Sequence, residues 1–126
     1  MNRIEWDSSI AIVGTHLVGY YIAQWSFEET VARLITLSGQ AAKSGDQYKV
    51  SVKFVGRFNG DVFTLYDYKC DRTLHIGGTR VDHVAALRQA LTRRLRRVAP
   101  TPYRAREYYE GKRTYHRFEL KTEGTL

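Results

Sequence analysis

Arginine supplies the clearest chemical pattern in this sequence. Ten basic residues stand between Arg88 and Arg117, against two acids, Glu107 and Glu110. The whole chain has a formal net charge of +7, so the rest of it is close to neutral. Guanidinium groups bind phosphates and carboxylates through paired hydrogen bonds. The segment therefore predicts an acidic partner, most often nucleic acid. The alternative is a solvated helix face followed by a soluble tail.

Tyrosines alternate with these arginines in the last part of the segment. Tyrosine rings stack on nucleobases, and Tyr and Arg are also common anchors in protein interfaces. The candidate partner-binding residues are Arg93, Arg96, Arg97, Arg104, Arg106, Arg113, Arg117, Tyr108, Tyr109 and Tyr115. The alternative is an extra hairpin whose tyrosines cover the core.

A second candidate site is the glycine pair Gly77-Gly78, with Arg80 beside it. A glycine pair directly before a helix leaves backbone N–H groups that can hold an anion, such as a small phosphate ligand. The favoured alternative is a tight strand-to-helix turn in which Thr79 caps the helix.

The remaining polar residues predict no catalytic or metal centre. The four histidines have no spacing typical of metal ligands. Cys70 lies between Lys69 and Arg72 without a catalytic motif, so we expect an ordinary loop cysteine. No phosphate-binding loop, nucleophile elbow or dinucleotide motif is present. We therefore expect a protein that is not an enzyme and carries no cofactor or metal.

The elements that position these residues follow from periodicity. Residues 10–23 mix β-branched and aromatic residues with two glycines and predict a strand, bulged at a glycine. A helix begins at the capping pair Ser26 and Glu29 and ends at Gly39. Residues 48–54 alternate apolar and polar side chains, as a half-buried strand does.

The second half of the domain is predicted in the same way. Asn59-Gly60 favours a tight hairpin turn into a strand over residues 62–68. A short strand over residues 74–76 leads to a helix over residues 80–98, which has an apolar stripe on one side and Arg93, Arg96 and Arg97 on the other. Residues 103–120 predict a hairpin that turns at Glu110-Gly111.

These elements predict a single α+β fold in the order β-α-β-β-β-α. Two helices would pack on one face of a small, mostly antiparallel sheet over residues 1–99. Residues 100–126 would form a basic, aromatic C-terminal extension, because Pro100 and Pro102 end the second helix.

Asp67 has the most unusual predicted position. A two-residue turn at Asn59-Gly60 places Phe54 opposite Leu65 and Asp67 opposite Val52, in an otherwise apolar row. A buried carboxyl can act as a general acid or base. We favour a structural role in which Asp67 accepts backbone hydrogen bonds, because buried polar groups need partners.

Four short motifs in the first part of the chain form a recognisable set. They are GTHLVGY at residues 14–20, GDQYKV at 45–50, GDVFTLYDYK at 60–69 and HIGG at 75–78. Through them, about half of the chain resembles a family of small uncharacterised proteins of tailed phages and prophages. The resemblance implies a phage-encoded accessory role, and it implies no catalytic residues.

Together these features predict a non-catalytic accessory protein that inhibits or modulates a host defence complex through its basic surface. One alternative is weakly specific nucleic-acid binding, and a second is a phosphate-ligand binder or enzyme that uses the Gly77-Gly78 turn. The start of the chain lacks a secretory pattern, and no segment is apolar enough to span a bilayer. We expect a monomer or homodimer in the cytoplasm of a bacterial host, bound to an acidic protein complex or nucleic acid and not to membrane.

Overall fold

The computed structural model describes residues 2–40, 52–68, 72–110 and 113–120, and for residues 104–120 it describes the backbone alone. Its main sheet has five strands in the order β1-β3-β4-β5-β2, and each neighbouring pair is antiparallel. The strands are β1 (Ile4–Trp6), β2 (His16–Tyr21), β3 (Lys53–Phe58), β4 (Asp61–Tyr66) and β5 (Leu74–Gly78). The predicted α+β fold is confirmed.

Helix α1 (Phe27–Ser38) has the predicted ends. The Ser26 side chain accepts a hydrogen bond from the Glu29 amide at 3.2 Å. Gly39 ends the helix with φ of +70°, a left-handed conformation that glycine adopts without steric cost. Both ends of α1 are therefore determined by residues close to them in the sequence.

Helix α2 (Val84–Leu95) is shorter than the predicted 80–98. A 3₁₀ turn, η1 (Val81–His83), precedes it, and Arg80 before that turn is extended. No side chain caps either start, so Thr79 is not the helix cap that we expected. The apolar stripe of α2 is buried as predicted, and it comprises Val84, Leu87, Leu91 and Leu95.

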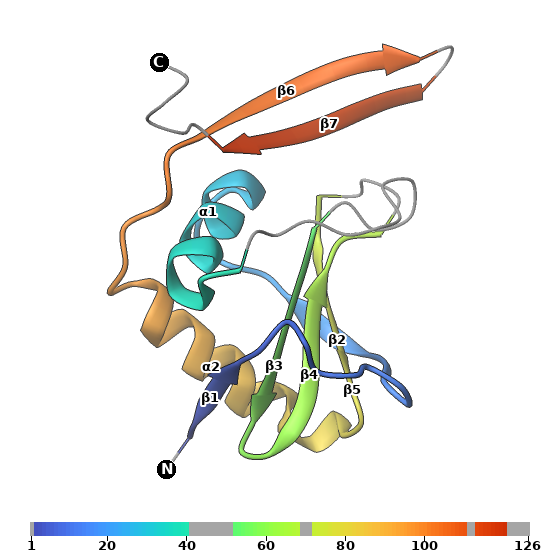
Figure 1. Cartoon of the computed structure of the whole chain (residues 1–126), viewed down its shortest axis with the longest axis vertical. Helices are drawn as coiled ribbons and strands as arrows, with labels where there is room; N and C mark the ends of the chain where they lie inside the picture. The colour runs from blue at the N-terminus through green and yellow to red at the C-terminus, as the bar shows by residue number, and fades with distance from the viewer. Residues whose placement is uncertain (1, 41–51, 69–71, 111–112, 121–126) are drawn as a thin grey trace.

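Both helices pack on the same face of the sheet, and Figure 1 shows them side by side against it. The core centres on a row of Phe54, Leu65 and Ile76, which face one another across β3, β4 and β5. These three side chains are at most 1% exposed, and they join Leu34 of α1 and Leu91 of α2 in one cluster. The periodic patterns also predict a core that includes Phe27, Leu34, Val50, Phe54, Leu65, Ile76 and Leu91. This is confirmed for the five buried residues above, whereas Phe27 is only partly buried and Val50 lies outside the described residues.

The hairpin between β3 and β4 has the predicted turn and register. Asn59 and Gly60 have φ of +50° and +90°, and Phe58 lies opposite Asp61. Asp67 is 1% exposed, and its carboxylate accepts a hydrogen bond from the Val52 amide at 3.0 Å. The prediction that Asp67 is buried and hydrogen-bonded is confirmed.

The two edge strands come from the start of the chain. Strand β1 was not predicted; it pairs with β3 through three residues, Ile4 to Trp6. Strand β2 is shorter than predicted, and its pairing with β5 shifts between Leu17 and Gly19. That shift is a β-bulge, as the glycine predicted.

The C-terminal segment forms a separate two-stranded sheet of β6 (Tyr103–Glu110) and β7 (Arg113–Leu120). In Figure 1 this hairpin, in orange and red, lies beyond α1 and apart from the main sheet. Its connection to α2 is held against α1, where the Thr101 amide donates to the Ala32 carbonyl at 3.0 Å. The predicted turn residue Gly111 lies outside the described residues. None of the described helices has the length and hydropathy needed to cross a membrane.

Candidate anion-binding groove

A groove lies where the edge strand β2 meets α2. Its lining residues are Tyr21, Ile22, Arg88, Gln89, Thr92, Arg93, Arg96 and Arg97. Four of them are arginines, and none is acidic. The arginines Arg93, Arg96 and Arg97 were predicted to be exposed opposite the apolar stripe, and all three are exposed. The structure adds that they share one concave surface with Arg88.

Beside the groove, α2 packs closely on β2 at Gly19. A Cβ atom on Gly19 would lie 2.9 Å from Val84 Cγ1 and 3.1 Å from the Arg88 guanidinium. Glycine is therefore required at this crossing, because a larger side chain would push the helix away. The close approach places Arg88 directly over the edge of β2.

Tyr21 and Thr92 form the floor of the groove. Tyr21 is 3% exposed, and its hydroxyl lies 2.8 Å from Thr92 Oγ1 in a hydrogen bond between strand and helix. Burial raises the pKa of Tyr21, so its phenol is neutral at physiological pH. Beside it, the Ile22 side chain is 84% exposed and gives the groove an apolar rim.

Two of the arginines are held by neutral acceptors. Arg88 Nε donates to the Tyr20 carbonyl at 2.6 Å. Arg96 donates from Nε and Nη2 to Gln24 Oε1 at 3.3 and 3.0 Å. Hydrogen bonds of this kind orient a guanidinium without cancelling its charge. Among the described residues, no carboxylate forms an ion pair with any groove arginine.

Another arginine satisfies the end of α2. Arg33 of α1 donates to the carbonyls of Leu95 and Val98 at 3.0 and 2.9 Å, and its guanidinium lies 4.4 Å from the centre of the Trp25 ring. Cations stabilise the last turn of a helix through its dipole. Because Arg33 supplies donors there, the groove arginines are not needed as caps.

The remaining predicted arginines lie on the C-terminal hairpin. In its register Arg106 is opposite Arg117, Tyr108 is opposite Tyr115, and Tyr109 is opposite Thr114. Opposed residues share a face of a sheet and alternate along a strand. Arg104, Arg106, Tyr108, Arg113, Tyr115 and Arg117 therefore share one face, and Tyr109 belongs to the other. A contiguous surface that joins the hairpin to the groove stays a prediction.

The predicted turn at Gly77-Gly78 is wrong. Both glycines lie inside β5, buried and paired on one side with β4 and on the other with β2. A Cβ on Gly77 would lie 2.3 Å from Thr64 Oγ1, so this glycine permits close packing between strands. The glycine pair that predicted a turn instead allows the strands of the sheet to pack closely.

The anion site expected at that turn loses its basis. Its amides belong to a strand and not to a helix start. The nearby cavity has a volume of about 20 Å³, the room of about one water molecule. Arg80 is engaged by Asp82 at 2.7 Å and lies 3.9 Å from Asp61. That guanidinium is therefore already close to two carboxylates.

Within the part of the chain that the structure describes, no three His, Cys, Asp or Glu side chains gather as a metal site. Cys70 lies outside the described residues. No protein-family model, curated protein or solved structure matches the chain. The function is therefore inferred from the groove itself.

Arg88, Tyr21 and Ile22 were not among the predicted site residues. Arg88 could have been found, because Arg88, Thr92 and Arg96 follow one another at helical i, i+4 spacing. Tyr21 and Ile22 carried no such signal, since they reach the groove only through the pairing of β2 with β5.

Proposed function

We propose that this protein is a non-catalytic binding protein that engages an acidic macromolecule through the groove between β2 and α2. The observation that supports this proposal is the set of four arginines, Arg88, Arg93, Arg96 and Arg97, on one concave surface. Their described hydrogen bonds go to neutral oxygens, so their charge is retained for a partner.

The groove suits an extended acidic partner. Arg88 and Arg96 are eight residues apart, which corresponds to about 12 Å along a helix. Several phosphates or carboxylates of one partner can therefore be bound at the same time. Like charges this close repel one another, and an acidic partner relieves that repulsion when it binds.

The biological setting of this binding is also a proposal. The resemblance to small phage and prophage proteins supports an accessory role in the cytoplasm of a bacterial host. There the protein would inhibit or modulate a host defence complex by occupying an acidic surface of that complex or of its nucleic acid. No residue is assigned a catalytic role in this proposal.

The test is affinity capture from bacterial lysate with and without nuclease. One variant carries Arg93→Gln, Arg96→Gln and Arg97→Gln. A matched control carries Arg3→Gln, Arg72→Gln and Arg80→Gln, which removes the same charge from arginines that have carboxylate partners.

We expect the wild type and the matched control to capture the same partner and the groove variant to lose it. Loss of capture after nuclease treatment would identify nucleic acid as the partner, and retention would identify a protein. Equal capture by the two triple variants would overturn the proposal, because charge alone would then explain binding.

A further inference from the structure

A row of aromatic side chains crosses the sheet on the face opposite the helices. Tyr66 of β4 lies opposite His75 of β5, and His75 lies opposite Tyr20 of β2. At the other end of the row, Lys53 of β3 lies opposite Tyr66. Neighbouring strands are about 4.8 Å apart, so these four residues form one continuous line across four strands.

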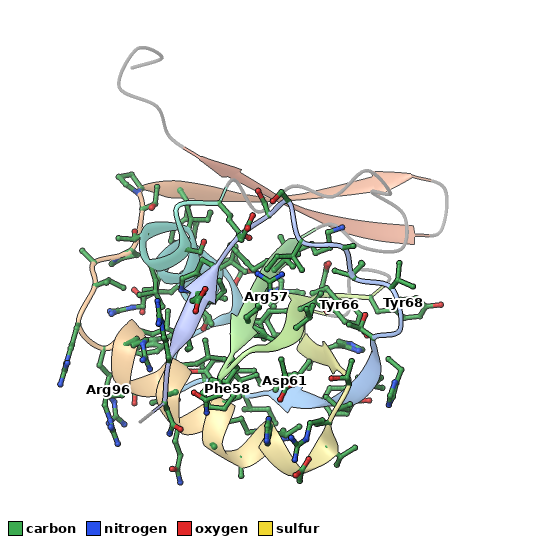
Figure 2. The ribbon with its side chains drawn as sticks, turned by 60° about the horizontal axis from the view of Figure 1, so that its bottom comes forward. Arg57, Phe58, Asp61, Tyr66, Tyr68 and Arg96 are labelled. Carbon is green, nitrogen blue, oxygen red and sulfur yellow. The ribbon has the colours of Figure 1, made fainter. Side chains whose placement is uncertain are left out.

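The rings of this row contact one another. The ring centres of Tyr20 and His75 are 5.0 Å apart, and those of Tyr66 and His75 are 5.2 Å apart. Tyr68, just after β4, adds a fourth ring at 6.3 Å from His75. The four rings therefore make one aromatic patch, and Figure 2 shows Tyr66 and Tyr68 next to each other at its β4 end.

The two outer rings of this patch are exposed. Tyr20 is 43% exposed and Tyr68 is 42% exposed, whereas Tyr66 is half-buried and His75, between them, is buried. The bulge in β2 places Leu17 on the same face, because Leu17 is opposite Gly77 while Tyr20 is opposite His75. Leu17 is 46% exposed and extends the apolar surface along the sheet edge.

The aromatic patch ends where the arginine groove begins. The carbonyl of Tyr20 accepts the hydrogen bond from Arg88, and the next residue, Tyr21, forms the floor of the groove. A ligand that leaves the patch over β2 therefore meets Arg88 first and the other groove arginines after it. Flat apolar rings and unneutralised guanidinium groups follow one another along a single path.

We infer that this path binds single-stranded nucleic acid, with bases stacked on Tyr20, Tyr66 and Tyr68 and phosphates on the groove arginines. The inference rests on the proposed function, which it narrows to one class of partner. Unpaired bases offer faces to tyrosine rings, whereas the bases of a duplex are already stacked on one another. An acidic peptide would use the arginines and leave the aromatic patch unused.

The experiment measures fluorescence anisotropy of a labelled oligothymidylate of about ten nucleotides, a length within the site sizes of known single-strand binders. It is repeated with a duplex of the same length and with polyglutamate. We expect the single strand to bind tightest. Absence of oligothymidylate binding, or equal binding of the duplex or polyglutamate, would overturn the inference.

Paired variants test the rings. Tyr20→Leu and Tyr68→Leu remove a stacking ring but keep an apolar side chain, and each is expected to weaken binding about tenfold. Tyr20→Phe and Tyr68→Phe keep the ring and should bind like the wild type. Thermal melting of all four confirms that each is folded. Equal affinity of the Leu and Phe variants would overturn the inference.

The groove variant separates this inference from the proposed function. One outcome is that the triple variant Arg93→Gln, Arg96→Gln and Arg97→Gln weakens binding of every probe while the Leu variants do not. In that case the proposed function of the groove is supported, and the inference of base stacking on the aromatic patch is wrong. If the groove variant binds all three probes as the wild type does, the proposed function fails as well.

Discussion

The arginines before α2 and those along it have different partners. Before the helix, Arg80 pairs with Asp82 at 2.7 Å, and Asp61 lies 3.0 Å from His83 Nδ1. Within the helix and at its C-terminal end, Arg88 and Arg96 donate to a backbone carbonyl and to an amide oxygen. The first group is neutralised locally, whereas the second keeps its full charge. The kind of acceptor, more than the number of arginines, therefore decides how much positive charge a surface keeps.

The ion pairs before α2 also reduce the charge that this region offers to an acidic partner. Exposed ion pairs stabilise a fold little, but they lower the net field that a distant partner meets. The Arg80 hydrogen bond holds the pKa of the Asp82 carboxyl below its usual value, so the pair is intact at neutral pH.

The largest effect is expected from charge reversal in the groove. Changing Arg93, Arg96 and Arg97 together to Glu should weaken partner binding at least about a hundredfold, because like charges then face the partner. Binding is measured by titration at several salt concentrations, and thermal melting checks that the fold is unchanged. For a single strand, the slope of log affinity against log salt should fall by about 2 in the corresponding Gln variant, at about 0.7 for each phosphate contact. Arg80→Gln is the control, and an equal loss of binding there would erase the difference between the arginines before α2 and those along it.

The second effect concerns stability. Arg33→Met removes the donors that satisfy the carbonyls of Leu95 and Val98, and should lower the free energy of unfolding by about 1.5–3 kcal/mol. Urea unfolding gives this value. Arg93→Met, on the exposed side of the same helix, should stay within about 0.5 kcal/mol of the wild type. Similar values for both would mean that the end of α2 needs no cap from α1.

A smaller loss is expected on the floor of the groove. Tyr21→Phe removes the hydroxyl that lies 2.8 Å from Thr92 Oγ1, and should cost about 0.5–1.5 kcal/mol of stability. Tyr20→Phe is the neighbouring control and should change the melting temperature little. A Tyr21→Phe protein as stable as the wild type would show that apolar packing alone joins β2 to α2.

The smallest effect is expected at Asp82. Its pKa is lowered from 3.8 by the Arg80 hydrogen bond, so its contribution to stability is present above that value and is lost as the pH falls below it. Asp82→Asn should therefore lose slightly less stability than the wild type during acid titration. Unfolding curves across the acid range test this, and a steeper acid decline in Asp82→Asn would contradict the pairing.

Much of the fold could be predicted because its signals are local. Ser26 and Glu29 cap α1 within three residues, and Asn59-Gly60 sets the register of the next two strands. From that register alone, Asp67 could be placed in the buried row and given a backbone partner, which the Val52 amide supplies. Such interactions form between residues that are close in the sequence, so short sequence patterns predict them.

Other features depend on residues that are distant in sequence. The Gln40 side chain accepts from the Val55 amide at 3.0 Å and donates to the Val55 carbonyl at 2.7 Å, as another strand would. Nothing near Gln40 in the sequence predicts this pairing. The three residues of β1 are too few to give a periodic pattern.

Only the side of the groove that α2 supplies could be predicted from the sequence. The apolar stripe of α2 predicts the exposed side of Arg93, Arg96 and Arg97. The floor residue Tyr21 and the rim residue Ile22 come from another part of the chain. The turn predicted at Gly77 was wrong because glycine suits both a turn and close packing between strands, here against Thr64. Only the surrounding sheet distinguishes the two uses.

The strand order β1-β3-β4-β5-β2 has a consequence for how the molecule assembles. The hairpin of β3 and β4 pairs neighbours in sequence, and β5 can add to it directly. Both outer strands are made first during synthesis, yet each must wait for a partner much later in the chain. Contacts between such distant segments form slowly, because closing a long loop costs entropy before the contacts can stabilise the fold. The β2 side of the groove is therefore expected to form late in folding, so ligand binding would report a nearly complete fold.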